Sequence, residues 1–198
     1  MTNEVGTKAK ILRAAADVIR AKGLGKATTR AIARAAGLSE GALYKHFDSK
    51  LDMFLSLLRS SPSDFVTLVM SLPERAGQGS VTGNLQDLAE RALEFYQRSL
   101  PMGSSLFAEP ELLARNREEL RQRRAGPQLA NEALADYLRR ERELGRVRQE
   151  VDVNVVADLL LGACFQRAYL AQFIGPEMNE ADIEAYAAGV VRALTPAL

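Results

Sequence analysis

Residues 28–47 read TTRAIARAAGLSEGALYKHF, and this stretch decides the fold of the amino-terminal part of the chain. The two threonines at its start favour a helix, because a threonine oxygen caps the free backbone N–H groups of a first turn. Ile32, Ala33 and Ala36 then follow at helical spacing. Gly37 stands where a left-handed residue ends a helix. The stretch therefore predicts a short helix that ends in a tight turn.

The residues after the turn predict a second short helix. Ser39 is suited to cap it, and Leu43 and Phe47 form its buried side. Two short helices joined by a turn with glycine form a helix-turn-helix. Small residues at the start of the second helix would let it enter a DNA major groove, while Tyr44 and Lys45 reach phosphates. A plain helical hairpin with a solvated basic face is the alternative that this pattern leaves open.

The charge of the chain is polarised. Residues 1–50 contain ten Lys or Arg against four Asp or Glu, a net charge of +6, and the remainder has a net charge of −5. The overall value of +1 conceals this difference. A basic end is the electrostatic signature of phosphate binding. An acidic remainder would orient the molecule so that only the basic end meets DNA.

From about Lys8 to Phe54 the sequence resembles the TetR/AcrR family of bacterial transcriptional regulators. The motifs that carry this resemblance lie at residues 28–33, 36–39, 43–47 and 49–50. The resemblance implies a three-helix DNA-binding head over residues 1–50 and a ligand-binding and dimerisation body over residues 51–198. It also implies a homodimer and a small-molecule inducer.

By position, the resemblance implies which residues contact DNA. Those that match phosphate contacts are Thr29, Tyr44, Lys45, His46 and Lys50. Those that match positions facing base edges are Ser39, Gly41 and Ala42, and Arg30 and Glu40 complete the predicted DNA-binding set. Many relatives have an aromatic residue where this chain has Lys45, although a lysine also reaches a phosphate.

The whole chain predicts an all-α protein, with three helices in the head and six in the body. Apolar residues make up 47% of its 198 residues, enough for a sizeable core, and alternating strand patterns are not sustained. The helices that we expect beyond the head span residues 50–60, 85–100, 106–113, 129–144, 152–174 and 180–194. We expect a loop over residues 73–83 and an interruption at residues 101–103, because both contain Pro and Gly.

Aromatic and apolar residues of the body predict a pocket for a neutral or weakly charged hydrophobic ligand. The predicted lining residues are Phe65, Leu68, Phe95, Tyr96, Met102, Leu106, Phe107, Phe165, Gln166 and Tyr169. The alternative is that most of them are ordinary core residues. This prediction rests on the family resemblance.

The last two helices are apolar enough to pair with those of a second copy in a four-helix interface. The predicted interface residues are Val156, Leu160, Ile183, Ala187, Val190 and Leu194. An intramolecular core is the alternative.

The sequence predicts no enzyme, no metal site and no cofactor. It contains a single His, His46, and a single Cys, Cys164, and it lacks a Gly-rich phosphate loop, metal-ligand spacing and a GxSxG turn. Cys164 reads as a buried hydrophobic residue, with a redox sensor as the alternative. We expect no run long enough to span a bilayer, no signal peptide and a cytoplasmic protein.

These features predict a DNA-binding transcriptional regulator, most simply a repressor. It would bind a pseudo-palindromic operator as a homodimer and be released by a small hydrophobic inducer. A regulator without a small-molecule inducer and a helical interaction module that does not bind DNA are the alternatives. The effector, the target genes and the choice between repression and activation are left open.

Overall fold

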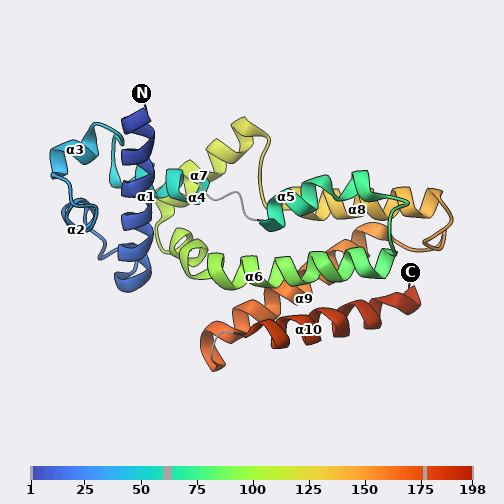
Figure 1. Ribbon diagram of the computed structural model, residues 1–198. Coiled ribbons are helices and arrows are strands. Elements are labelled where there is room, and N and C mark those ends of the chain that lie inside the picture. Colours follow the sequence, from blue (N-terminus) through green and yellow to red (C-terminus); the bar gives the residue numbers. More distant parts are fainter. Residues whose placement is uncertain (1, 60–63, 176–177, 198) are drawn as a thin grey trace. The chain divides into compact units, whose positions relative to one another are not determined.

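The computed structural model describes residues 2–59, 64–175 and 178–197, and every regular element in these ranges is a helix (Figure 1). The predicted all-α fold with a helix-turn-helix head is therefore confirmed. Contacts divide the chain into two compact units. One comprises residues 1–62 and 101–119, and the other comprises residues 63–100 and 120–198. The functional division after residue 50 remains a prediction.

The first unit contains the head. Its helices are α1 (Thr2–Lys22), α2 (Thr29–Ala35), α3 (Glu40–Tyr44) and α4 (Lys50–Arg59), joined by the end of α6 (Val81–Phe107) and the start of α7 (Pro110–Arg123). Helix α1 packs against α2 and α4, and α2 packs against α3. Their apolar side chains form one cluster with Ile11, Leu43, Phe54 and Leu112 fully buried in it. Burial of this kind is what holds such short helices in place.

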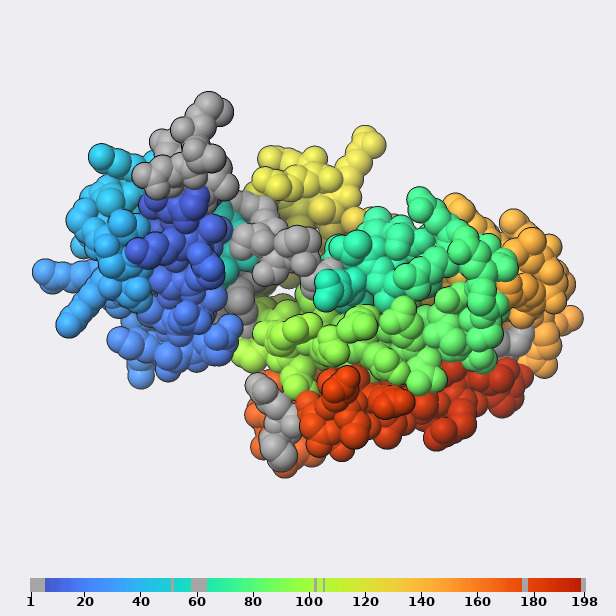
Figure 2. Space-filling model, viewed as in Figure 1, coloured from blue at the N-terminus to red at the C-terminus, as the bar shows by residue number. Residues whose placement is uncertain are grey.

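The second unit is a bundle around a separate core. Its elements are α5 (Asp64–Ser71), η1 (Leu72–Arg75), most of α6, α8 (Gln128–Glu143), α9 (Val153–Ile174), α10 (Glu180–Leu194) and η2 (Thr195–Ala197). Helix α8 packs against α5, η1 and α9, and α9 packs against α10. Leu88, Leu93, Tyr137 and Leu160 lie at 0% exposure in its core. Helices α6 and α10 lie side by side on the face shown in Figure 2.

The last two helices begin where the sequence predicted. Asp152 caps α9, because its carboxylate accepts the N–H groups of Asn154 and Val155. Asn179 caps α10 in a reciprocal arrangement with Asp182. Each cap satisfies backbone donors that a helix start leaves unpaired.

Helix α6 is longer than the sequence predicted. It begins at Val81, inside the expected loop, and it continues through Pro101 to Phe107 where an interruption was expected. A proline removes one backbone N–H from the hydrogen-bond ladder but leaves the bonds on either side intact. The Ser104 hydroxyl also donates to the carbonyl of Pro101 at 3.0 Å. The expected break is therefore wrong.

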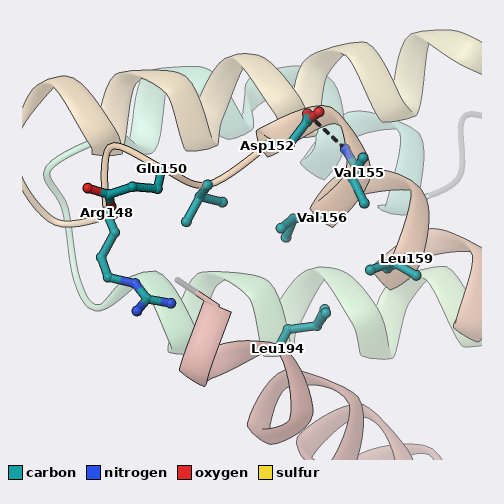
Figure 3. Close-up of a pocket in the computed structure, with 8 residues that line it drawn as sticks. Arg148, Glu150, Asp152, Val155, Val156, Leu159 and Leu194 are labelled. Carbon is teal, nitrogen blue, oxygen red and sulfur yellow. Dashed lines mark hydrogen bonds between the residues drawn. The ribbon is translucent and has the colours of Figure 1, made fainter.

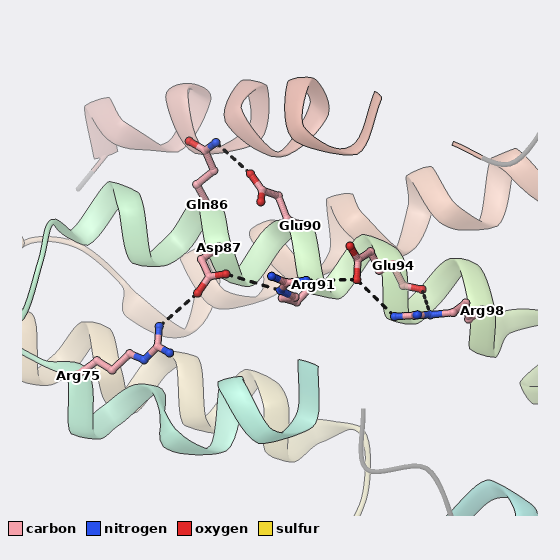
Figure 4. A network of polar contacts seen from close by, with 7 residues as sticks. All are labelled: Arg75, Gln86, Asp87, Glu90, Arg91, Glu94 and Arg98. Carbon is pink, nitrogen blue, oxygen red and sulfur yellow. Dashed lines mark hydrogen bonds and ion pairs between the residues drawn. The ribbon is translucent and has the colours of Figure 1, made fainter. Parts of the chain in front are cut away.

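One side of α6 carries a network of ion pairs (Figure 4). Arg75 of η1 lies 3.2 Å from Asp87, and Arg91 lies 3.7 Å from Asp87 and 3.6 Å from Glu94. Arg98 lies 3.4 Å from Glu94. These side chains are partly exposed, so each pair contributes little to stability, on the order of 0–1 kcal/mol. They keep this side of α6 toward water while the opposite side enters the core.

A buried carboxylate joins two loops of the second unit. Glu141 is at 0% exposure, lies 3.1 Å from the Arg146 guanidinium and accepts the N–H of Gly77. The Asn84 amide donates to the nearby Tyr137 hydroxyl at 2.9 Å, and burial raises the pKa of Tyr137 to about 12. Buried polar groups need such partners, because an unpaired one carries a large desolvation cost.

Helix α9 meets the length and hydropathy criteria of a membrane span, with a mean hydropathy of 1.2 over its best window. The expectation that no run is long enough is therefore wrong. Core helices share this length and composition, and α9 places Ala157, Leu160 and Cys164 at 0% exposure in the core. It also leaves large apolar side chains exposed, among them Phe173 and Ile174.

Candidate functional site

Side-chain caps set the geometry of the helix-turn-helix. The Thr28 hydroxyl accepts the N–H of Ala31 at 3.1 Å, and the Ser39 hydroxyl accepts the N–H of Ala42 at 3.1 Å. Gly37 between them has a φ of +63°, a left-handed conformation that favours glycine. The caps and the turn are those that the sequence predicted.

Helix α3 is anchored by its apolar side. Ile32 of α2, Leu43 of α3 and Phe47 after α3 are at most 2% exposed and belong to the core of the first unit. The Lys8 ammonium lies 5.3 Å from the centre of the Phe47 ring. Only the opposite side of α3 is thus left to meet a partner.

The outward side of α2 and α3 carries most of the predicted DNA-binding residues, and Lys50 begins α4. Exposed among them are Arg30, Ser39, Glu40, Gly41, Tyr44 and Lys45, and half-buried are Thr29, Ala42, His46 and Lys50. A Cβ atom on Gly41 would meet no atom within 4 Å, so the absence of a side chain there serves no packing within the chain. A smooth helix start of this kind fits close approach to base edges.

Three of these residues are linked by hydrogen bonds. The Thr29 hydroxyl donates to the Glu40 carboxylate at 2.5 Å, and the Tyr44 hydroxyl donates to the Thr29 oxygen at 3.5 Å. The first bond is charge-assisted because its acceptor is a carboxylate, and the second is long and weak. No sequence pattern predicts these bonds, because eleven residues separate Thr29 from Glu40.

The start of α4 is capped from within the chain. The Ser49 hydroxyl accepts the N–H of Asp52 at 3.0 Å, and the Asp52 carboxylate accepts the N–H of Asp48 at 3.2 Å. These two amides are therefore not free for a phosphate. Lys50 lies half-buried at the first residue of the helix and remains the cation at this end.

Two lysines of α1 add positive charge beside the turn. Lys8 lies over Phe47, and the Lys10 Nζ atom lies 3.6 Å from the place that a Cβ atom on Gly37 would take. Both are exposed. No sequence pattern assigns these two lysines to the site, since only the packing of α1 brings them beside the turn.

A row of aromatic rings runs from the core of the second unit to its surface. Successive ring centres lie 5.0–6.4 Å apart, in the order Phe65, Phe95, Tyr96, Phe165, Tyr169 and Phe173. Burial raises the pKa of Tyr96 to about 12, so its hydroxyl is neutral at physiological pH. Phe173, the last ring, is 70% exposed.

Polar groups beside this row form hydrogen bonds with backbone groups of the same chain. The Gln97 amide both donates to the carbonyl of Met178 and accepts its N–H. The Cys164 thiol lies 3.7 Å from the carbonyl of Ala89, and burial raises the pKa of this thiol to about 12. A raised thiol pKa fits the buried hydrophobic residue better than a redox sensor.

A groove of about 520 Å³ lies beside the amino-terminal half of α9 (Figure 3). Its apolar floor includes Val155 and Leu159 of α9 and Leu194 of α10, and charged residues of the loop before α9 form its rim. Val155 is 50% exposed and Leu159 is 54% exposed. Exposed apolar side chains grouped on one helix face are typical of interaction surfaces.

Comparisons with known proteins agree with this geometry. Residues 11–57 match the family described as bacterial regulatory proteins, tetR family. The nucleoid occlusion factor SlmA of Glaesserella parasuis serovar 5 is 31% identical over 137 residues, which cover 59% of this chain and 67% of that protein. The chain belongs to the TetR family. The family is one of DNA-binding transcriptional regulators, a class that is generally not enzymatic.

Other relatives differ in how much they share with this TetR-family chain. The regulator SrpR of Pseudomonas putida is 43% identical over 54 residues, 27% of this chain and 25% of that protein. The SlmA of Marinomonas sp. strain MWYL1 is 29% identical, and the chain spans 57% of its length. A solved structure of a TetR-family regulator from Mesorhizobium loti covers 99% of this chain and 98% of its own, with a TM-score of 0.78 at 22% identity. That likeness shows the shared fold.

The structure separates the predicted ligand residues into two groups. Phe65, Leu68, Phe95, Tyr96, Phe165, Gln166 and Tyr169 lie in the second unit, and the first four are buried or half-buried. Leu106 and Phe107 belong to the other unit, where Leu106 packs against the head core and Phe107 is 76% exposed. The side chain of Met102 lies outside the described residues.

The predicted interface residues lie mostly inside one chain. Val156, Leu160, Ile183 and Ala187 are buried in the core of the second unit, and Val190 and Leu194 are half-buried. A side chain buried in its own core offers little surface to a second copy. The large apolar side chains that α9 does expose are Val155, Leu159, Phe165, Tyr169, Leu170, Phe173 and Ile174.

Proposed function

We propose that this chain is a cytoplasmic, ligand-responsive repressor that binds a pseudo-palindromic operator as a homodimer. The observation that carries the proposal is the outward side of α3, which is smooth at Gly41, polar at Tyr44 and Lys45 and fixed by buried Leu43. A helix of this kind fits the major groove, with its first turn on base edges and its later residues on phosphates.

The exposed stripe of α9 supports the homodimer. Val155, Leu159, Gly162, Tyr169 and Phe173 follow one another at steps of three, four or seven residues, the spacing of one helix face. Gly162 lies near the middle of the helix, and a Cβ atom there would meet no atom within 4 Å. A two-fold axis beside Gly162 would let two copies of α9 approach closely.

The groove of Figure 3 fits the same arrangement. If two α9 helices cross in opposite directions at Gly162, residues equally far from it lie opposite each other. Val155 and Tyr169 are both seven residues from Gly162. The exposed rings of Tyr169 and Phe173 in one copy would then fill the groove beside Val155 and Leu159 in the other.

The aromatic row supports a neutral, hydrophobic inducer. Its rings are packed at both buried and exposed positions, and the Tyr96 hydroxyl is a neutral polar group within it. The amide of Gln97 and the thiol of Cys164 are engaged by backbone groups. Rings and neutral groups of this kind would favour a ligand of the same character.

Release from DNA would follow from a population shift. Two α3 helices must lie about 34–36 Å apart to enter successive major grooves. An inducer that binds better to a dimer with another spacing lowers the population that fits the operator. The inducer can lower the DNA affinity only by as much as it prefers the other dimer over the one that fits the operator.

Selection of bound duplexes from a random pool tests the proposal. The purified protein should enrich one sequence with two inverted half-sites about 10 base pairs apart, centre to centre, or a multiple of that. Its affinity should fall steeply with salt, because phosphate contacts release counterions. Enrichment of a sequence without inverted symmetry would contradict the dimer, and no enrichment at low salt would contradict specific DNA binding.

The relatives named nucleoid occlusion factor favour a second candidate, a nucleoid occlusion factor with the same DNA-binding head. One of them, from Shewanella pealeana, is 28% identical over 89% of this chain. Mapping the occupied sites on the chromosome separates the two candidates. A repressor should occupy promoters, whereas sites spread over the chromosome away from promoters would favour the second candidate.

A further inference from the structure

Glu40 is an unexpected residue on the surface that we propose to face DNA. It is the only acidic residue in the stretch 28–47, and it lies exposed at the first position of α3. A carboxylate at this place repels DNA phosphates, so it weakens every non-specific contact of the head. Because Glu40 weakens non-specific DNA binding, we expect it to have a function that the surrounding basic residues do not provide.

Hydrogen bonds show what Glu40 does in the free protein. Its carboxylate accepts the Thr29 hydroxyl proton at 2.5 Å, and the Thr29 oxygen accepts the Tyr44 hydroxyl proton at 3.5 Å. Each hydroxyl has one proton to donate. While the Thr29 hydroxyl donates its proton to Glu40, it cannot donate to a phosphate. The Tyr44 hydroxyl donates to Thr29 and is likewise engaged within the protein.

We propose that Glu40 reads a base and couples that reading to the phosphate contacts of Thr29 and Tyr44. A carboxylate in the major groove accepts a hydrogen bond from the N4 amino group of cytosine. When the Glu40 carboxylate accepts a bond from cytosine, it releases the Thr29 hydroxyl. The hydroxyls of Thr29 and Tyr44 can then each donate to a phosphate. This inference rests on the proposed DNA-binding function.

The coupling makes Glu40 a specificity-determining residue. On a matching site, the new bond to cytosine replaces the bond to Thr29, and both hydroxyls gain phosphates. On any other sequence, Glu40 keeps its hydrogen bond with Thr29. Its negative charge then repels the phosphates, and no bond to a base offsets this repulsion. The same carboxylate thus strengthens cognate binding and weakens non-cognate binding, which is how an interface gains discrimination.

A purely structural role is the competing explanation, in which Glu40 only joins α3 to α2. The substitution Glu40→Gln separates the two, because a glutamine amide oxygen still accepts the Thr29 hydroxyl. Glutamine pairs with adenine rather than cytosine in the major groove. A structural role predicts an unchanged base preference for this variant, whereas base reading predicts a change at one position.

The experiment is selection from a random duplex pool with the wild-type protein, Glu40→Gln and Glu40→Ala. We expect a G·C pair at one position of each half-site for the wild type, a shift toward A·T there for Glu40→Gln, and loss of preference there for Glu40→Ala. The discrimination lost at that position should be about tenfold or more. Other positions should be unchanged.

Affinity for a random-sequence duplex is the second readout. Glu40→Ala should bind it several-fold more tightly than the wild type does. Asp17→Asn is the matched control, because it removes the same charge from an exposed site on α1 without touching Thr29, and its effect should be smaller. Equal effects of Glu40→Ala and Asp17→Asn would overturn the coupling to Thr29 and Tyr44.

Identical base preferences for all three proteins would overturn the inference while leaving the proposed function intact. A uniform loss of binding by Glu40→Gln, with no shift at any position, would also overturn it and favour the structural role. If the wild type enriches no sequence, the proposed function fails as well.

Discussion

The thiol of Cys164 illustrates how a single residue is constrained by burial. It is at 0% exposure, and burial raises its pKa from 9.0 to about 12. Only the thiolate reacts at an appreciable rate. A thiol reagent at pH 8 should therefore leave the native protein unlabelled and label one thiol per chain after denaturation. Rapid stoichiometric labelling of the native protein would favour the redox-sensor reading.

The same residue predicts how stability depends on pH. The folded protein keeps Cys164 protonated, whereas an unfolded chain loses this proton near pH 9. The stabilisation is therefore complete below pH 9 and is lost as the pH rises toward 12. The free energy of unfolding should fall over this range, and it should fall less for Cys164→Ala.

Residues near each other in the sequence were predicted best. The caps at Thr28 and Ser39 and the turn at Gly37 depend on neighbours within three residues, so their geometry follows from local chemistry. The hydrogen bond between Thr29 and Glu40 and the one between Gln97 and Met178 connect residues that are distant in the sequence. No local pattern contains that information.

At the scale of elements, α9 shows the limit of a periodic pattern. The sequence predicted the helix at 152–174, and the structure has it at Val153–Ile174. Because α9 is apolar over most of its circumference, the pattern did not identify the side that enters the core. Predicted interface residues Val156 and Leu160 face inward, and Val155 and Leu159 lie on the exposed side.

Proline at position 101 shows a second limit. The sequence predicted a break there, since proline is a strong helix breaker in isolated helices. In the folded chain α6 continues through Pro101 to Phe107, so the lost hydrogen bond does not end the helix there.

Helix α9 carries the prediction for the dimer. Leu159→Asp places a charge in the middle of the exposed apolar stripe, so it should shift the protein from dimer to monomer in sedimentation equilibrium at micromolar concentration. Asn154→Asp is the matched control, because it adds the same charge to an exposed polar position of the same helix, and it should leave the dimer intact. A Leu159→Asp variant that stays dimeric would place the interface elsewhere.

At the scale of the whole molecule, the sequence predicted the class of fold and the family. The helix-turn-helix motif, the charge of +6 in residues 1–50 and the helical periodicity all pointed to one architecture. The ligand pocket was harder to predict, because apolar residues that line a cavity and those that fill a core have the same composition. The separation of Leu106 and Phe107 from the aromatic row depends on how the chain divides into two units.

The insertion of α3 into the major groove is tested most directly by Ala42→Glu, measured as equilibrium affinity for the duplex that the wild type selects. Ala42 lies on the outward side of α3, so a glutamate there should meet base edges and phosphates and lower the affinity about 100-fold or more. Ala21→Glu, which adds the same charge at an exposed site on α1, should lower it far less. Equal affinities of Ala42→Glu and wild type would contradict the placement of α3 in the groove.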